Sequence, residues 1–372
     1  MRTPACDLLG VEFPLVAFSH CRDVVAAVTN AGGFGVLGAV AYSPEQLETE
    51  LRWIDGQVGG RPYGVDVLVP GKIAEEARDK QADLLALIPE EHKNFVRALL
   101  EKYGVPGAEP VRAPRGSGTR VTAEGATELI DVALSHPIRL IASALGTPPP
   151  EMVAAARARD VPVAALVGTV EHARRQVAAG ADLIVAQGTE AGGHTGEIAT
   201  MVLVPQVVDA VAPVPVLAAG GIASGRQMAA AMALGASGVW TGSVWLTTEE
   251  AETLPAVKQK MLAATSRDTV RSRSRTGKPA RQLVSAWTEE WEGPDSPGSL
   301  PMPLQMVLAE TAVRRINQAA ESGSSGAREL ANYFVGQVVG QLDQVKPAKQ
   351  VVYDMIEEFA DAVERMGTLI KD

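Results

Sequence analysis

Cysteine is nearly absent from this chain of 372 residues, which contains only Cys6 and Cys21. Two cysteines cannot build the disulfide framework of a small secreted domain, and by themselves they cannot hold a zinc ion. Aromatic residues are also scarce, at 4%, whereas glycine is abundant, with 36 residues. This composition suits a chain with many tight turns between strands and helices better than a β-sandwich.

Long apolar runs and an excess of positive charge are missing as well. No stretch approaches about 18 uninterrupted apolar residues, so no membrane span is predicted. The net charge of −10 argues against a general nucleic-acid-binding protein. The first residues include Asp7 and Glu12 and lack the apolar core of a signal peptide, so we expect a cytoplasmic protein. No His, Asp and Glu residues pair at the spacing of metal ligands, and no metal site is predicted.

The sequence does contain the material for a large core. With 46% hydrophobic and 21% charged residues, global disorder is excluded. Eight short and almost continuous apolar segments alternate with helical stretches at most junctions: residues 13–18, 33–40, 63–69, 137–144, 161–168, 181–188, 214–221 and 237–243. Strands of a parallel sheet, buried on both faces, have this pattern. Eight of them predict a (β/α)8 barrel, and a doubly wound open sheet is the alternative.

Two regions interrupt or follow this alternation. Residues 71–136 contain a charged helical part and a turn-rich stretch. We interpret them as a helical insertion at the top of the barrel, either a lid or a contact that would make the protein a homo-oligomer. The barrel then occupies residues 1–264, and residues 265–372 form a mostly helical C-terminal subdomain.

Two helices in the barrel region have clear start signals. Ser43 precedes Pro44 and is followed by Gln46, which is the pattern of a capping box with proline in the first turn. Ser224 and Gln227 predict a second capping box after the seventh apolar segment.

The end of the sixth apolar segment has the strongest functional signal. Residues 187–196 read QGTEAGGHTG, with four glycines around His194. In a (β/α)8 barrel, active sites lie at the carboxyl ends of the strands. Glycines allow a ligand to approach the backbone closely, so His194 is the candidate catalytic residue. The alternative is a flexible loop with a solvated histidine.

Two further glycine turns follow the seventh and eighth segments. Gly220 and Gly221 precede the helix that starts at Ser224, and Gly242 and Ser243 precede the last barrel helix. Barrel loops at these two positions commonly bind a phosphate group through backbone N–H groups. We therefore expect a phosphate site here, with two ordinary turns as the alternative.

Two polar residues lie near the same end of the predicted barrel. Asp66 interrupts an apolar strand, and strand alternation places it on the face opposite Val65 and Val67. A buried carboxylate is costly unless it is paired, so it either serves the site or bonds a neighbouring loop. His20 directly follows the first strand and could face the pocket.

A basic cluster lies in the C-terminal region of this acidic chain. The simpler interpretation is a surface patch that neutralises neighbouring Asp and Glu residues. The sharper one is recognition of an anionic group such as a CoA or carrier phosphate. Its members are Arg267, Arg271, Arg273, Arg275, Lys278 and Arg281.

Several of these segments resemble those of the nitronate monooxygenases, formerly called 2-nitropropane dioxygenases. The resemblance rests on AQGTEAGGHTG and on VLAAGGIASGRQMAAAMALGASGVWTGS, and it extends to VVAAVTNAGGFGVLG upstream and SRTGKPAR downstream. It implies a barrel that holds one non-covalent FMN, with His194 as catalytic base. The residues that the resemblance places at the cofactor are Ala17, Phe18, Ser19, Asp66, Gln187, Gly192, Gly193, Gly220, Gly221, Trp240, Thr241, Gly242 and Ser243.

The chain departs from the family pattern at two places. The family usually has Asn where this chain has Asp66, and the AFSH turn after the first strand lacks the usual Pro-Met start. An amide can donate to a flavin carbonyl, whereas an ionised carboxylate can only accept a hydrogen bond. These changes concern the substrate and the reaction more than the fold and the cofactor.

Three functions are compatible with this pattern. The first is a nitronate monooxygenase that oxidises a small-molecule nitronate or nitroalkane with molecular oxygen. The second is an NAD(P)H-dependent flavin reductase acting on an enoyl or other acyl thioester, because flavin-dependent enoyl reductases are similar in these segments. The third is a barrel without flavin that binds a phosphorylated metabolite.

Overall fold

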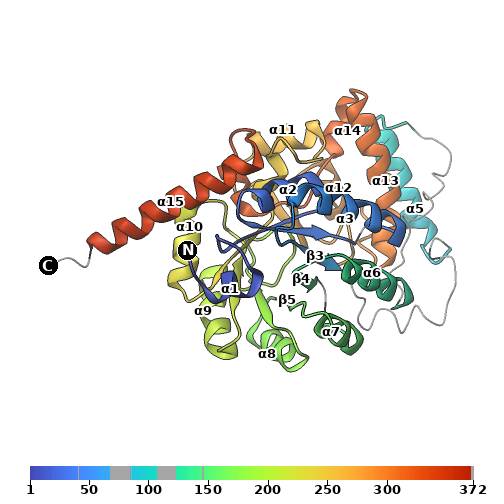
Figure 1. Cartoon of the computed structure of the whole chain (residues 1–372). Coiled ribbons are helices and arrows are strands. Elements are labelled where there is room, and N and C mark those ends of the chain that lie inside the picture. Colours follow the sequence, from blue (N-terminus) through green and yellow to red (C-terminus); the bar gives the residue numbers. More distant parts are fainter. Residues whose placement is uncertain (41, 68–83, 85, 107–122, 145, 370–372) are drawn as a thin grey trace.

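The computed structural model describes residues 1–40, 42–67, 84, 86–106, 123–144 and 146–369, except for the side chains of 123–126. Its centre is a closed barrel of eight parallel strands with helices around it (Figure 1). Each of the eight predicted segments overlaps one strand, with β1 ending one residue beyond its segment, so the predicted (β/α)8 barrel is confirmed. The barrel strands are β1 (Leu15–Ser19), β2 (Phe34–Gly38), β3 (Gly64–Val67), β4 (Leu140–Ser143), β5 (Val163–Val167), β6 (Leu183–Gln187), β8 (Val216–Ala219) and β9 (Gly238–Thr241).

Side chains fill the barrel interior because successive residues of each strand point alternately inward and outward. Phe34, Leu140 and Leu217 are among the fully buried residues of this inner cluster. The helix α1 (Pro4–Leu9) adds Leu9 to the cluster. The Thr3 hydroxyl donates to the carbonyl of Ser237, just before β9 begins, so α1 covers the end of the barrel opposite the candidate site.

The barrel helices begin largely as expected. Ser43 forms the complete capping box with Gln46. At Ser224 the hydroxyl accepts from the Gln227 N–H, but the Gln227 side chain accepts from the N–H of Ala223, so the predicted box is only half formed. The helices are α2 (Arg22–Asn30), α3 (Pro44–Val58), α6 (Ala123–Ser135), α7 (Pro150–Arg157), α8 (Val170–Ala178), α9 (Thr200–Val211), α10 (Gly225–Ala233), η1 (Ser243–Thr247) and α11 (Pro255–Ala263).

The region between β3 and β4 contains two described helices in different places. Leu129 and Ile130 of α6 pack in one cluster with Leu47 of α3 and with Val65 on the outer face of β3. Thus α6 covers the barrel as the helix between β3 and β4. The helix α5 (Glu90–Lys102) instead packs against α13. Much of the predicted lid lies outside the described residues, and the division at residues 71–136 stays a prediction.

The C-terminal region combines helices with a β-hairpin that the sequence analysis did not anticipate. The strands β10 (Thr269–Ser272) and β11 (Ala280–Leu283) are antiparallel, and β11 pairs with β7 (Gly193–His194). Their arginines and serines lack the alternating apolar pattern by which a strand is recognised. The other elements are α12 (Ala286–Glu292), α13 (Leu304–Glu321), α14 (Ser325–Leu330), η2 (Gln337–Gln341) and α15 (Ala348–Thr368).

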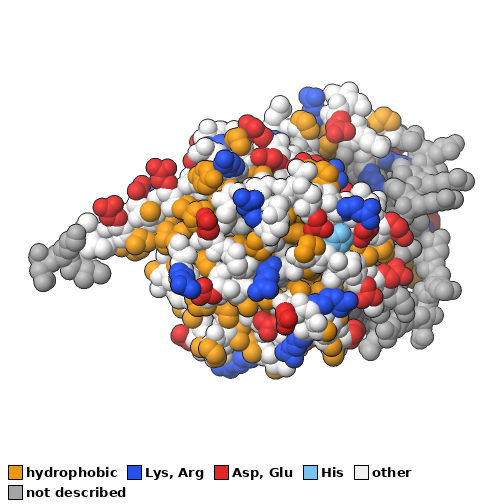
Figure 2. All heavy atoms as spheres, viewed as in Figure 1, with side chains coloured by type: hydrophobic (Ala, Val, Ile, Leu, Met, Phe, Trp, Pro, Cys, Tyr) orange, Lys and Arg blue, Asp and Glu red, His pale blue; other side chains and the backbone are white. Residues whose placement is uncertain are grey.

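The last helix, α15, packs against α10 and α2 and then extends beyond the barrel as an arm (Figure 1). Hydrophobic side chains line one side of the arm (Figure 2). Among the residues of α15, Val363 and Met366 are exposed. No helix in the described part of the chain combines the length and apolarity needed to cross a membrane.

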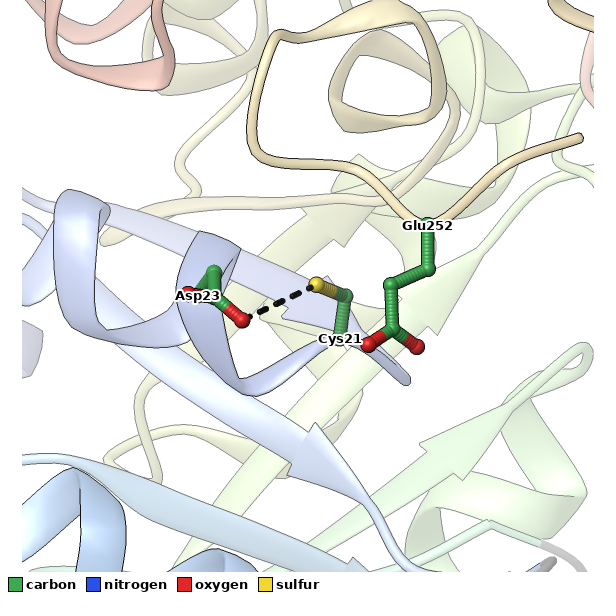
Figure 3. A group of neighbouring side chains, drawn as sticks. All are labelled: Cys21, Asp23 and Glu252. Atoms are coloured by element: carbon green, nitrogen blue, oxygen red, sulfur yellow. Dashed lines mark hydrogen bonds between the residues drawn. The ribbon is translucent and has the colours of Figure 1, made fainter. Parts of the chain in front are cut away.

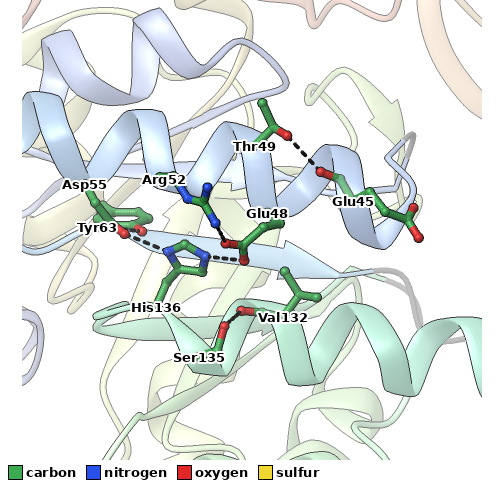
Figure 4. A network of polar contacts seen from close by, with 9 residues as sticks. All are labelled: Glu45, Glu48, Thr49, Arg52, Asp55, Tyr63, Val132, Ser135 and His136. Atoms are coloured by element: carbon green, nitrogen blue, oxygen red, sulfur yellow. Dashed lines mark hydrogen bonds and ion pairs between the residues drawn. The ribbon is translucent and has the colours of Figure 1, made fainter.

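A histidine clamp joins α3 to the segment that leads into β4 (Figure 4). His136 Nδ1 lies 2.6 Å from Asp55 Oδ2, and His136 Nε2 lies 2.9 Å from Glu48 Oε2. Both partners are acceptors, so the ring binds them best as an imidazolium that donates from both nitrogens. Burial lowers the pKa of His136, but the hydrogen bonds to Asp55 and Glu48 outweigh it, and the pKa is raised.

We expect His136→Gln to lower the melting temperature by a few degrees at pH 6, because one amide cannot donate to both carboxylates. A raised pKa in the folded state means that the clamp stabilises the fold fully below the unfolded pKa of histidine and loses this effect as pH rises through the folded pKa. The difference between wild type and variant should therefore shrink toward pH 9. Thermal unfolding across this range measures it, with the exposed His172→Gln as control. A gap that stays constant with pH would contradict a charged clamp.

Candidate active site

The glycine-rich loop after β6 is held in place by the C-terminal hairpin. His194 lies in β7 and pairs with Ala280 of β11. Its Nε2 lies 2.9 Å from the hydroxyl of Thr276, and its ring centroid lies 6.4 Å from that of Phe334. Burial, with a smaller contribution from Lys278, lowers the pKa of His194 to about 4. The ring is therefore neutral near pH 7, which is the protonation state of a base ready to accept a proton.

A partly buried contact fixes the start of the same loop. The Glu190 carboxylate accepts from the N–H of Thr200 (3.0 Å) and from its hydroxyl (2.8 Å), at the first turn of α9. A side chain at Gly188 would place its Cβ 2.0 Å from the Thr200 hydroxyl oxygen, so only glycine fits there. The role of Glu190 could not be predicted, since nothing in the local sequence shows that Thr200 folds back onto it.

A second missed element is the segment that precedes η2. The N–H of Gly336 donates to the Ser243 hydroxyl at 2.8 Å, and the N–H of Gln337 donates to the Glu190 carbonyl at 2.9 Å. Gly192 is also covered, because a Cβ there would lie 2.8 Å from the carbonyl carbon of Val335. This segment thus joins the loops after β6 and β9, and its sequence has no motif that announces this role.

The two predicted phosphate loops come together with the glycine-rich loop at the carboxyl ends of β6, β8 and β9. Gly220 and Gly221 have φ angles of 95° and 70°, which only glycine adopts readily. A Cβ added at Gly242 or at Gly193 would meet nothing within 4 Å, so both border open space. The Ser243 oxygen accepts from Gly336, but its proton remains available to donate.

Thr241 is placed differently from the residues around it. Its hydroxyl donates to the carbonyl of Val16 at 2.9 Å and accepts from Trp245 Nε1 at 3.0 Å. The side chain thus belongs to the barrel wall. Ala17 also points outward, into the core formed with the surrounding helices, and the Ser19 hydroxyl accepts from the N–H of Cys21. A ligand at the mouth could therefore bind only the backbone groups of Thr241, Ala17 and Ser19, or accept the hydroxyl proton of Ser19.

Phe18, Trp240 and Gln187 lie on the inner side of the barrel mouth. The rings of Phe18 and Trp240 stack with centroids 6.2 Å apart and pack on the inner cluster. Gln187 ends β6 on the inward-pointing side, because Val185 before it lies in the same inner cluster. These side chains give the mouth an apolar floor with one amide.

Asp66 reaches the same mouth from β3. It is 4% exposed, and its Oδ1 has no hydrogen-bond partner within the described part of the chain. Its strand neighbours Val65 and Val67 pack outward, so the carboxyl group points into the barrel. Burial raises the pKa of Asp66 to about 7. Among the described residues, no loop residue donates a hydrogen bond to Asp66 Oδ1, so the interpretation that Asp66 bonds a neighbouring loop has no support there.

His20 lies over Gly38, the residue of β2 that pairs with Asp66 of β3. Its Nδ1 is 2.9 Å from the carbonyl oxygen of Gly38, which pairs directly with Asp66 across β2 and β3. Gly38 has no side chain, and a Cβ there would lie 2.6 Å from the His20 ring. The ring therefore fills the space over Gly38. Burial lowers the pKa of His20, although the hydrogen bond to Gly38 opposes this.

The basic cluster is not a uniform surface patch, and for two members the simpler interpretation is wrong. Arg281 is 8% exposed, and its Nε donates to the carbonyl of Thr189 at 2.9 Å. Arg275 donates to Asn332 Oδ1 at 2.7 Å and lies over the ring of Phe334. These guanidinium groups donate to oxygen atoms of the glycine-rich loop and the tail, and Arg281 also interacts electrostatically with Glu190.

One group of possible metal ligands lies outside the barrel mouth. Ligand atoms of Cys21, Asp23 and Glu252 lie within 4.8 Å of one another (Figure 3). The Cys21 sulfur donates to the carbonyl of Glu250 at 3.1 Å, and burial raises the pKa of its thiol. A metal ligand must be the thiolate, so this environment disfavours metal binding.

Comparison with known proteins gives consistent matches over almost the whole chain. The family model for nitronate monooxygenase matches residues 3–358. A Mycobacterium tuberculosis protein named "Putative monooxygenase Rv1533" is 63% identical, and the match covers 100% of both chains. The structure of nitroalkane oxidase from Streptomyces ansochromogenes has a TM-score of 0.79 at 28% identity, covering 97% of this chain and 99% of that one. FabK from Thermotoga maritima has a TM-score of 0.73 at 28% identity, covering 100% of both.

Proposed function

The chain belongs to the nitronate monooxygenase family of oxidoreductases, and from this premise we propose that it is an FMN-dependent enzyme that oxidises nitronates and nitroalkanes with molecular oxygen. The observation that carries the proposal is the convergence of three glycine loops and one unpaired carboxyl group on a single barrel mouth.

The residues at the mouth fit an FMN. The open space beside Gly242 and Gly193 leaves room for a ligand to lie against the backbone. Gly221, after β8, and Ser243, after β9, belong to the loops that meet there. Backbone N–H groups in such loops suit a phosphate group. The unpaired Oδ1 of Asp66 suits a polar group of the flavin ring. When bound, FMN supplies the redox chemistry by passing electrons from the substrate to oxygen, while the protein supplies position and electrostatics.

In this proposal His194 is the catalytic base. Its neutral ring accepts the α-proton of a nitroalkane, and Thr276 orients the ring through Nε2. The ring of Phe334 lies beside the imidazole, with the two ring centroids 6.4 Å apart. A nitronate has already lost this proton, so for that substrate His194 would serve only to position it.

The second candidate function is an NAD(P)H-dependent reductase of an acyl thioester. It is favoured by the departures from the family pattern at Asp66 and at Phe18-Ser19-His20, which change the mouth where the substrate would bind. Two parallel assays of the purified protein separate the candidates: oxygen consumption with a nitronate, and NADPH oxidation with an enoyl-CoA. Activity in the first assay alone supports the proposal, and activity in the second alone overturns it. A protein that is colourless and takes up no FMN would contradict both.

Asp66→Asn tests how Asp66 affects the cofactor. Reduction adds negative charge to the flavin, so a nearby carboxylate disfavours it, and removing that charge should raise the reduction potential. With a pKa of about 7, Asp66 is mostly ionised at pH 8.5 and mostly neutral at pH 5.5. We therefore expect a clear rise at pH 8.5 and a small one at pH 5.5. Potentiometry with a dye of known potential measures both, and equal potentials at pH 8.5 would mean that Asp66 does not face the ring.

A further inference from the structure

A groove of about 320 Å³ lies beside the hairpin, outside the barrel mouth. Arg271 and Arg273 border it, Trp291 and Glu292 reach it from the end of α12, and Ser299 completes it. None of these residues is among those proposed to hold FMN, and none contacts the His194 side chain in the hydrogen bonds and ring contacts described above. The groove is therefore a separate feature of the surface.

The residues that border the groove include hydrogen-bond donors that the described part of the chain leaves unpaired, and two of these donors are buried. Trp291 is 3% exposed, and its Nε1 has no partner. The Nε of Arg271 is buried and also has none. Arg273 is exposed, and no described residue forms an ion pair or hydrogen bond with its guanidinium group. The free donors at the groove are thus the guanidinium N–H groups of Arg273, which suit an acceptor-rich ligand.

The charge balance of the groove favours an anion. The residues that line the groove carry two guanidinium groups and one carboxylate, that of Glu292. The Oε1 of Glu292 already accepts a hydrogen bond from the Ser272 hydroxyl at 2.9 Å. Arg271 Nη1 lies 3.8 Å from Glu197, which is itself highly exposed. Phosphate oxygens accept several hydrogen bonds at once and match the planar donors of arginine.

The groove is coupled to the candidate active site by a direct contact. Arg271 Nη2 donates at 3.2 Å to the carbonyl of Thr195, the residue after His194. Adjacent strands lie about 4.8 Å apart, so β10 lies about 10 Å from β7 across β11. A ligand held in the groove could thus place another part of itself near His194 only if it is extended.

We propose that this groove binds a phosphate group of an extended substrate or cosubstrate whose reactive end reaches His194. Two molecules carry such a phosphate: a CoA thioester and a nicotinamide nucleotide. The groove recognises the phosphate group that both molecules contain. These two molecules are the substrates of the second candidate function, on which this inference rests. Binding can be measured without turnover, so the test of the groove is separate from the activity assays.

Calorimetric titration of the full-length protein with CoA, NADPH and inorganic pyrophosphate tests the proposal. We expect saturable binding of CoA or NADPH. The ligand that binds more tightly identifies which of the two molecules the groove recognises. Arg273→Ala should weaken it by about 10-fold or more, since hydrogen bonds to charged groups are the stronger ones.

Arg267→Ala is the matched control, because Arg267 is an exposed arginine of the same basic cluster that does not border the groove. It should leave the affinity within about twofold of wild type, as a surface substitution away from the ligand does. Equal weakening by Arg267→Ala and Arg273→Ala would indicate general charge attraction and overturn the proposal. So would the absence of saturable binding by both CoA and NADPH, or unchanged affinity in a folded Arg273→Ala protein.

Discussion

His194→Asn should lower turnover of a neutral nitroalkane by about 10²–10⁴-fold, the usual contribution of a positioned base. Asparagine keeps a polar amide near Thr276 but cannot accept the α-proton. The FMN content and the melting temperature should change little, because His194 is tied to Thr276 and β11 rather than to the phosphate loops. Turnover of a preformed nitronate should fall much less, since that substrate has already lost its proton.

The pH profile gives a second test of the same role. A base works only when unprotonated, and the pKa of His194 is lowered to about 4 by burial. The acid limb of kcat/KM due to this residue should therefore lie near pH 4 rather than near 6.5. Steady-state rates of wild type and variant, with His172→Asn as an exposed control, measure both effects. Full activity of His194→Asn on the neutral substrate would remove His194 from the mechanism and make His20 the next candidate.

Gly221→Asp should abolish flavin retention. Gly221 has a φ of 70°, and a Cβ there would lie 3.5 Å from the Cβ of Glu190, so the new carboxylate enters a loop that already contains one acid. Its charge would repel the phosphate group, and its side chain would block approach to the backbone. The ratio of flavin to protein absorbance after gel filtration measures retention.

A matched control separates this effect from backbone strain. Gly60 also has a positive φ, of 78°, and a Cβ there would meet nothing within 4 Å. It lies in the turn between α3 and β3, far from the glycine loops along the chain. Gly60→Asp should keep wild-type flavin content. If Gly221→Asp retains full FMN as well, the phosphate group must bind elsewhere.

The barrel could be predicted from the sequence because its signals are local. Each strand is a short apolar run, and each is buried on both faces, so composition alone marks it. The helix start at Ser43 needs only residues within three positions. Because all barrel strands are parallel, their carboxyl ends meet at one end of the barrel, and for this reason the sequence predicts that the loops around Gly220 and Gly242 lie together at one mouth.

The burial and the lowered pKa of His194 could not be predicted from local sequence signals. Its pKa depends on burial beneath a hairpin and beside Phe334, which is 140 residues later in the chain. The hairpin strands are rich in polar residues and have no alternating pattern, so nothing local indicated that β11 pairs with the glycine-rich loop.

The amino-acid sequence by itself therefore determined the barrel and the order of its loops, and it singled out the histidine and the carboxyl group at the mouth. Only the tertiary structure decided what holds the loops. Glu190 binds the first turn of α9, Gly336 binds Ser243, and Arg281 binds the carbonyl of Thr189. Each is a polar contact between segments distant in the chain or between a loop and a helix start. Such contacts leave no periodic trace, because one hydrogen bond constrains one residue and not the pattern around it.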